Sequence, residues 1–162
     1  MSVLIVGSMA VDTVEFSSTG EQHELVGGSA TFASLSAGLY TDVRMVGVVG
    51  KDFPDATLKT LASRRVDLAG VQIVEGETFR WHGRYNADLS SRESLDTRLN
   101  VFEHFRPTLP ESYRSSRVVL LGNIHPDLQS EVLDQAQKPE LVAADTMNFW
   151  IKGTPEIGRA HV

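Results

Sequence analysis

Two adjacent glycines, Gly27 and Gly28, stand directly before a segment of small residues in the stretch GGSATFASLSAG. Glycine has no Cβ and reaches dihedral angles that other residues avoid, so such a pair lets the backbone come close to a ligand. Ser29 is a natural N-cap for the helix that we expect from Ala30 to about Leu39. A helix that begins at a ligand offers its first N–H groups to acceptor oxygens. The stretch predicts either a ligand-binding loop or only a tight turn before a helix.

Other kinds of site are less well supported. The stretch lacks the Gly-Lys-Ser/Thr ending of a P-loop, and GSMAVD (7–12) lacks the three-glycine spacing of a dinucleotide site. The absence of cysteine excludes disulfides, thiolate ligands and a Cys nucleophile. Four histidines show neither metal-ligand spacing nor a Ser–His–Asp arrangement, and we predict no metal site from them: His23, His82, His104 and His125.

Polar and glycine residues follow each of the expected buried strands. Asp12 comes shortly after VLIV (3–6), and Asn123 ends RVVLLGN (117–123). Because the carboxyl ends of parallel strands meet at one edge of a sheet, we expect these residues to gather there. A carboxylate accepts two hydroxyl donors at once, which suits a diol. Asp12 is also consistent with a turn or cap, and Asn123 with a plain polar group at a strand end.

The pattern of elements places these residues on an α/β fold. Apolar β-branched runs predict buried strands, and amphipathic segments that begin with Pro or Asp predict helices. We expect strands over 3–6, 11–16, 24–26, 43–50, 117–123 and 140–145, and helices over 30–39, 52–66 and 126–137. Between them, 71–76, 78–87 and 97–105 are strand-like, and 88–96 reads as a polar connection. This order predicts a three-layer sandwich from which a smaller β-sheet projects.

Composition restricts the possible functions further. The 162 residues carry a net charge of −6, which disfavours a nucleic-acid surface because phosphate backbones require basic patches. No apolar run approaches the ~20 residues that span a bilayer, and the N-terminal run lacks the basic start of a signal peptide. We therefore predict a cytoplasmic protein with no membrane partner.

The motifs together resemble the N-terminal half of the PfkB, or ribokinase-like, carbohydrate kinases. The matching segments are VGSMAVD (6–12), GGSATFASLSAGL (27–39), VRMVGVVGKDFPD (43–55), VDLAGV (66–71) and DTMNFW (145–150). Each motif alone is weak, but their order and spacing are specific, and they cover Val3 to about Trp150.

The resemblance implies an ATP- and Mg²⁺-dependent transfer of phosphate to a hydroxyl of a sugar, nucleoside or related small molecule. It implies that Asp12 and the loop Gly27, Gly28 and Ser29 hold the acceptor, with Asn123 near it. It also implies a projecting β-sheet, about 11–26 and 71–105, that covers the acceptor as a lid and can form a homodimer contact. The lid strand TFRWHGRY (78–85) has three side chains able to face the acceptor or to fill the lid core: Arg80, Trp81 and Tyr85.

Two positions depart from the family pattern. Sugar-binding members often have Asn a few residues after the double glycine and another two residues before the aspartate; this chain has Phe32 and Ala10 there. Both changes remove polar contacts, so the acceptor is expected to be less hydroxylated or to be bound partly by stacking, as a nucleoside or an aromatic alcohol would be. A non-enzymatic ligand- or dinucleotide-binding α/β domain is the alternative function.

The C-terminal motifs of the family are not found after Trp150. These are an Asn-x-x-Glu segment that organises Mg²⁺ and phosphate, and a Gly-Ala-Gly-Asp segment that supplies the general base. The last residues, 157–162, resemble a translated sequencing adapter, so we expect residues 1–156 to be an incomplete kinase domain without a catalytic residue of its own. Such a fragment is expected to be inactive.

Overall fold

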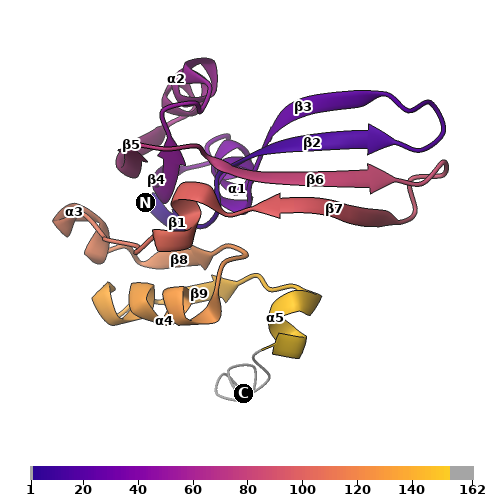
Figure 1. Cartoon of the computed structure of the whole chain (residues 1–162). Coiled ribbons are helices and arrows are strands. Elements are labelled where there is room, and N and C mark those ends of the chain that lie inside the picture. Colours follow the sequence, from indigo (N-terminus) through magenta and orange to yellow (C-terminus); the bar gives the residue numbers. More distant parts are fainter. Residues whose placement is uncertain (1, 154–162) are drawn as a thin grey trace.

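The computed structural model describes residues 2–153 (Figure 1). The segment 157–162, for which the sequence predicts a non-native origin, lies outside the described residues. No helix among residues 2–153 is long and apolar enough to cross a membrane.

The central sheet is entirely parallel, with the strand order β5-β4-β1-β8-β9. Its strands are β1 (Ser2–Val6), β4 (Asp42–Gly50), β5 (Val66–Val74), β8 (Val118–Leu121) and β9 (Leu141–Ala144). In β1, successive residues enter opposite cores: Leu4 packs in one hydrophobic cluster and Ile5 in the other. A strand that is buried on both faces needs such a continuous apolar run, which VLIV supplies.

Helices cover both faces of this sheet. On one face, α1 (Ser29–Ala37) and α2 (Asp55–Ser63) contribute Ala30 and Leu61 to the cluster that contains Ile5. On the other face, α3 (Glu111–Arg114) and α4 (Pro126–Gln135) contribute Tyr113 and Val132 to the cluster that contains Leu4. The predicted three-layer α/β sandwich is therefore confirmed.

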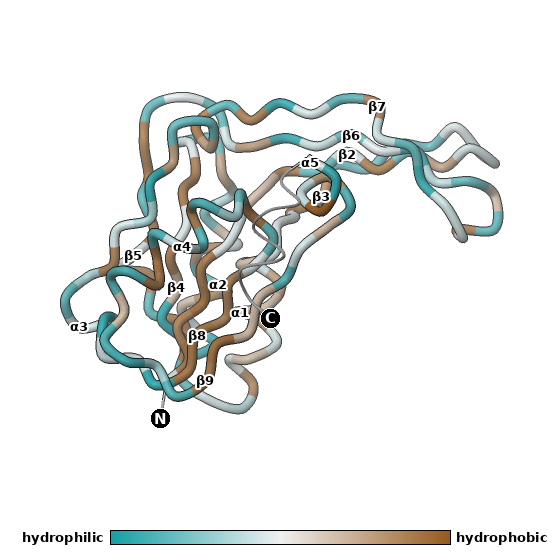
Figure 2. Tube along the Cα trace, turned by 90° about the horizontal axis from the view of Figure 1, so that it is seen from below, coloured by the Kyte–Doolittle hydropathy of each residue, from teal (hydrophilic) through white to brown (hydrophobic). Residues whose placement is uncertain are grey.

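A second, four-stranded sheet projects from this sandwich (Figure 1). It consists of β2 (Ala10–Phe16), β3 (Gln22–Gly27), β6 (Phe79–Tyr85) and β7 (Arg92–Arg98), in the order β3-β2-β6-β7. Only β2 and β6 run parallel to each other. Figure 2 shows that hydrophobic residues concentrate in the central strands, whereas the projecting end of the second sheet is largely hydrophilic. We call this second sheet the lid.

Three predictions of local structure were wrong. Residues 71–74 belong to β5 of the central sheet and pair with β4, so they are not part of the lid. Residues 92–96, read as a polar connection, lie in lid strand β7, because backbone pairing with β6 needs no apolar side chains. Residues 100–104, read as strand, form the 3₁₀ helix η1 (Asn100–His104), whose Asn100 has a positive φ of 50°.

The outer strand β9 exposes apolar side chains at the edge of the central sheet. Leu141 is 59% exposed and Val142 is 40% exposed, and α5 (Asn148–Gly153) follows without burying any residue. An unpaired apolar edge is a template for pairing with another chain.

We expect Leu141→Lys to reduce self-association of the purified chain, because a charge on an edge strand opposes edge-to-edge pairing. Light scattering against protein concentration measures this. Leu39→Lys is the matched control, since Leu39 is 58% exposed but lies in the turn after α1 and not on a strand. Equal effects of the two substitutions would contradict the edge-strand explanation.

Candidate functional site

The start of α1 lies against the carboxyl ends of β1 and β8. A Cβ on Gly7 would be 2.6 Å from Ser29 Oγ, and a Cβ on Gly122 would be 2.5 Å from the same atom. Gly7 follows β1 and Gly122 follows β8. The Ser29 hydroxyl thus fills the space that a side chain at either position would need. Gly28 has a φ of 101°, and a Cβ on it would be 2.4 Å from the Ser8 carbonyl oxygen. Glycine is therefore required at position 28 both for backbone conformation and for close approach.

Ser8 and Ser29 join these segments by reciprocal hydrogen bonds. The Ser8 N–H donates to Ser29 Oγ at 3.2 Å, and the Ser29 N–H donates to Ser8 Oγ at 3.1 Å. The Ala30 N–H donates to the Ser8 carbonyl oxygen at 2.9 Å. The N-cap is Gly28, not Ser29 as predicted, and the N–H groups of Ser29 and Ala30 are already bonded within the chain. Ser8 was not among the predicted site residues, although its position after a buried strand and Gly7 could have indicated a polar contact at this edge of the sheet.

The Asp12 carboxyl lies directly over Gly27. The two residues are on neighbouring strands of the lid, and a Cβ on Gly27 would be 2.0 Å from Asp12 Oδ2. Only glycine leaves room for the carboxyl in this position. The family resemblance implies that both residues are at the acceptor site, but their contact depends on strand register, which the sequence does not display.

Asp12 is a half-buried carboxyl. Its burial raises its pKa from the ordinary value of 3.8 to about 6. It is still mostly ionised above neutral pH, so it can accept hydrogen bonds from two hydroxyl groups. Its raised pKa is the kind of perturbation that is common at binding sites.

The alternation of the lid strands sorts the predicted lid residues onto two faces. Asp12 is directly opposite Leu25 on β3 and Trp81 on β6, so these side chains share a face, which we call the acceptor face. Tyr85, four residues after Trp81 on β6, is on the same face. Arg80 is on the opposite face and therefore does not share a face with Asp12.

Trp81 is held in place beside Asp12. Its indole N–H donates to Ser94 Oγ at 3.0 Å, and the Arg92 guanidinium lies 6.0 Å from its ring centroid. A Cβ on Gly83 would be 1.9 Å from the indole ring, so the ring occupies the space where this glycine has no side chain. The acceptor face thus carries the Asp12 carboxyl, which lies over Gly27, and an oriented aromatic ring, which lies over Gly83.

Phe32, the residue that departs from the family pattern, is 60% exposed on the first turn of α1. It lines a shallow hollow of about 250 Å³ between α1 and α2, together with Val26 and Leu35. Its large exposed ring is free of any described aromatic contact within residues 2–153. Contact with an acceptor stays a prediction for this residue.

Asn123 follows β8, but its side chain is engaged elsewhere. Its Oδ1 accepts from the Trp150 indole N–H at 2.9 Å, and its Nδ2 lies 3.0 Å from Met147 Sδ. His125 packs edge-on against Trp150, with ring centroids 5.0 Å apart. Asn123 therefore fixes the segment that follows β9, and the structure does not bring it together with Asp12.

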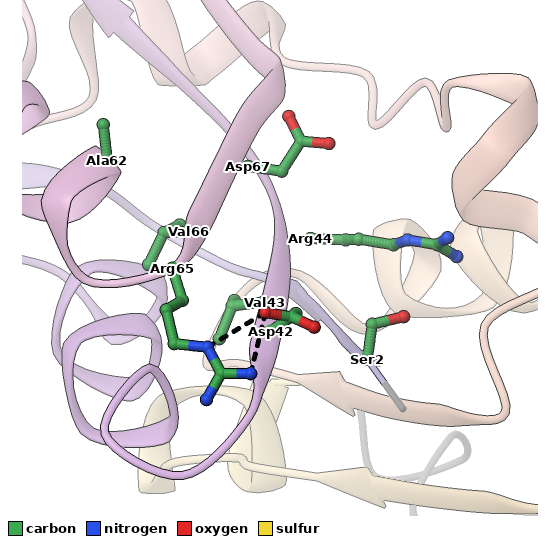
Figure 3. A pocket seen from close by; sticks show the side chains of 8 residues that line it. All are labelled: Ser2, Asp42, Val43, Arg44, Ala62, Arg65, Val66 and Asp67. Atoms are coloured by element: carbon green, nitrogen blue, oxygen red, sulfur yellow. Dashed lines mark hydrogen bonds and ion pairs between the residues drawn. The ribbon is translucent and has the colours of Figure 1, made fainter.

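Another hollow, of about 490 Å³, lies at the opposite edge of the central sheet (Figure 3). It is lined by the amino ends of β1, β4 and β5, where Arg65 pairs with Asp42 at 3.0 Å. Ligands of open α/β sheets bind at the carboxyl ends, so this hollow is a poor candidate site. Within residues 2–153, no group of three or more His, Cys, Asp or Glu is placed to hold a metal ion.

Comparison with known proteins identifies the fold. No protein-family model matches the sequence. A cytidine kinase from Thermococcus kodakarensis is 29% identical over 137 residues, which are 83% of this chain and 48% of that kinase. A nucleoside kinase from Methanocaldococcus jannaschii, an archaeal member of the ribokinase family, has a TM-score of 0.69 and 17% identity, over 89% of this chain and 52% of that one. Arabidopsis thaliana ribokinase, solved with ribose and ATP, has a TM-score of 0.66 and 20% identity, over 88% and 52%.

The chain thus has the ribokinase-like fold, and it spans about half the length of the kinases that it matches. The proteins similar to it are nucleoside and ribose kinases. This agrees with the resemblance carried by the sequence motifs.

We expect Gly27→Ala to destabilise the chain by about 1–3 kcal/mol, because the new methyl group and the Asp12 carboxyl cannot occupy the same space. Chemical denaturation measures the loss. The same substitution should cost much less in an Asp12→Ala background, where the carboxyl is absent. Equal costs in both backgrounds would show that Asp12 is not the obstacle.

Asp12 should also make stability depend on pH. Because its pKa is raised in the folded chain, the folded state holds this proton more tightly, and the stabilisation is lost as the pH rises from about 4 through 6. Asp12→Asn should therefore gain stability over the parent by about 1 kcal/mol between pH 4 and pH 7, a value reduced for partial solvation. Denaturation midpoints of both proteins at several pH values test this, and a pH-independent difference would contradict it.

Proposed function

We propose that this chain forms the acceptor-binding part of an ATP-dependent kinase that phosphorylates a sugar hydroxyl of a nucleoside. The observation that carries the proposal is the pairing of Asp12 and Trp81 on the acceptor face of the lid. The similarity to cytidine, nucleoside and ribose kinases supports the reaction class.

The two side chains have complementary uses for a nucleoside. The Asp12 carboxylate accepts two hydroxyl donors, which matches the vicinal diol of a ribose ring. The Trp81 indole offers a flat apolar surface, and stacking of a base on an aromatic side chain contributes about 1–3 kcal/mol. A sugar without a base would bind to Asp12 but would have nothing to stack on Trp81. Phe32 and Ala10, which stand where many sugar-binding members carry Asn, favour the less hydroxylated acceptor.

Phosphoryl transfer also needs positioned phosphates, a metal ion and a base for the attacking hydroxyl. In the proposal, ATP and Mg²⁺ are bound by the whole protein. The carboxylates of residues 2–153 do not form a metal cluster, so no step through Mg²⁺ is assigned to them. Asp12 is assigned the binding of hydroxyl groups and not proton abstraction.

Cytidine should bind the purified chain at least tenfold more tightly than ribose, because ribose lacks the base that stacks on Trp81. Fluorescence titration of a Trp150→Phe variant reports on Trp81, since Trp81 and Trp150 are the two tryptophans of the chain. Asp12→Asn should weaken cytidine binding by about 10- to 100-fold through the loss of charged hydrogen bonds. Asp96→Asn is the control, because Asp96 is on β7 and pairs with Arg98 on the lid.

Equal affinity for ribose and cytidine would contradict the stacking role of Trp81. Binding of a nicotinamide dinucleotide without any binding of nucleosides would favour the alternative, a non-enzymatic dinucleotide-binding domain. For the whole protein, transfer of the ATP γ-phosphate to cytidine is the expected activity, and a radiolabelled transfer assay measures it.

A further inference from the structure

Asp52 joins the central sheet to the lid with both of its carboxylate oxygens. It lies in the turn between β4 and α2, and so belongs to the sandwich. Its Oδ1 accepts hydrogen bonds at 2.7 Å from both the N–H and the hydroxyl of Thr78, the residue before lid strand β6. Its Oδ2 accepts from the Arg80 guanidinium at 2.9 Å. Every described bond of this carboxylate goes to the base of the lid.

The inner half of this joint is buried. Thr78 is fully buried, and its hydroxyl also accepts from the Gly50 N–H at the end of β4, at 3.0 Å. The Asn100 side-chain amide donates to the Thr78 carbonyl oxygen at 2.9 Å. A Cβ on Gly50 would be 2.2 Å from the Gly76 carbonyl oxygen, so the two segments cross at backbone contact. The point where β6 leaves the sandwich is therefore tightly defined.

The outer half of the joint is formed by Arg80. One guanidinium nitrogen bonds to Asp52, and another lies 3.0 Å from Glu24 on β3. Because the strand order is β3-β2-β6-β7, this side chain spans β2 on the face opposite Asp12. The planar fork of Arg can bind two carboxylates in fixed directions, whereas the single ammonium of Lys cannot.

The pKa values of Asp52 and Arg80 are both shifted in the direction that favours the charged form. Burial alone would raise the pKa of Asp52, but its hydrogen bonds to Thr78 and Arg80 lower it on balance. Burial alone would lower the pKa of Arg80, but its bonds to Asp52 and Glu24 raise it. Asp52 and Arg80 therefore each stabilise the charged form of the other.

We propose that Asp52, Arg80 and Glu24, which we call the lid bridge, set the angle of the lid relative to the sandwich and thereby the position of Asp12 and the acceptor face relative to the start of α1. Apolar contacts of Val11 and Val26 also hold the base of the lid, but such contacts have little directionality. Hydrogen bonds to a carboxylate are directional, so the bridge can fix an angle that packing leaves open. Arg80 is then a positioning residue and not an acceptor contact. The effect on acceptor binding rests on the function proposed above, whereas the effect on lid angle does not.

Spin-label distances test the lid angle directly. The chain has no cysteine, so Ala87→Cys at the exposed lid tip and Lys59→Cys on the exposed side of α2 place two labels uniquely. Arg80→Lys keeps the charge but loses the fork, and Glu24→Gln changes an exposed side chain that is not expected to affect folding. Both substitutions should broaden the distance distribution between the labels. Arg84→Lys is the matched control, because Arg84 is on the same strand and face but pairs with Glu15 inside the lid.

Cytidine titration of the same variants tests the consequence for Asp12. We expect Arg80→Lys to weaken binding by about 3- to 30-fold, the size of typical coupling between elements, and Arg84→Lys to leave it unchanged. An unchanged distance distribution in both Arg80→Lys and Glu24→Gln overturns the bridge. A broader distribution with unchanged cytidine affinity overturns its positioning role. If no variant binds nucleosides but the distributions broaden, the proposed function fails and the bridge as an angle-setting joint stands.

Discussion

The close backbone contact at Gly28 and Ser29 is the constraint on which the arrangement depends. Here the chain returns from the lid and enters α1 across the ends of β1 and β8, at distances that no Cβ would allow. The reciprocal bonds between Ser8 and Ser29 then fix the direction of entry. Because β3 ends at this crossing, the position of Gly27, and with it the space available to Asp12, is set by the sandwich core.

The two faces of the lid differ in how their charged side chains are paired. On the acceptor face, Asp12 is half-buried without a charged partner among the causes of its shifted pKa, and this is why its pKa is raised. On the opposite face, the charges are paired: Arg80 with Asp52 and Glu24, and Arg84 with Glu15. A carboxylate that binds a ligand must be left with unused hydrogen-bonding capacity, whereas structural charges are stable when that capacity is filled. The period-2 alternation of β2 and β6 keeps these two environments apart.

The sequence allowed good prediction of features that depend on local pattern. The buried strands and the two layers of helices follow from apolar runs and amphipathic segments, and the motif order indicated the ribokinase-like fold that the comparisons show. Features that depend on pairing were less predictable. Strand β7 was not predicted as a strand, because its residues are polar and its pairing with β6 depends on backbone hydrogen bonds rather than on an apolar pattern. Residues 71–74 were assigned to the lid because their composition does not reveal that β5 extends along β4.

The sequence by itself therefore determined most of the central strands and helices and their order, and its motifs marked Asp12 and the double glycine as candidate ligand-binding residues. Only the tertiary structure decided that the Asp12 carboxyl fills the space of the missing Gly27 side chain, that Trp81 shares its face, and that Arg80 does not. The reason is physical. Propensity and hydrophobic periodicity act over neighbouring residues, whereas register and the face that a side chain occupies are set by hydrogen bonds and packing between segments far apart in the chain.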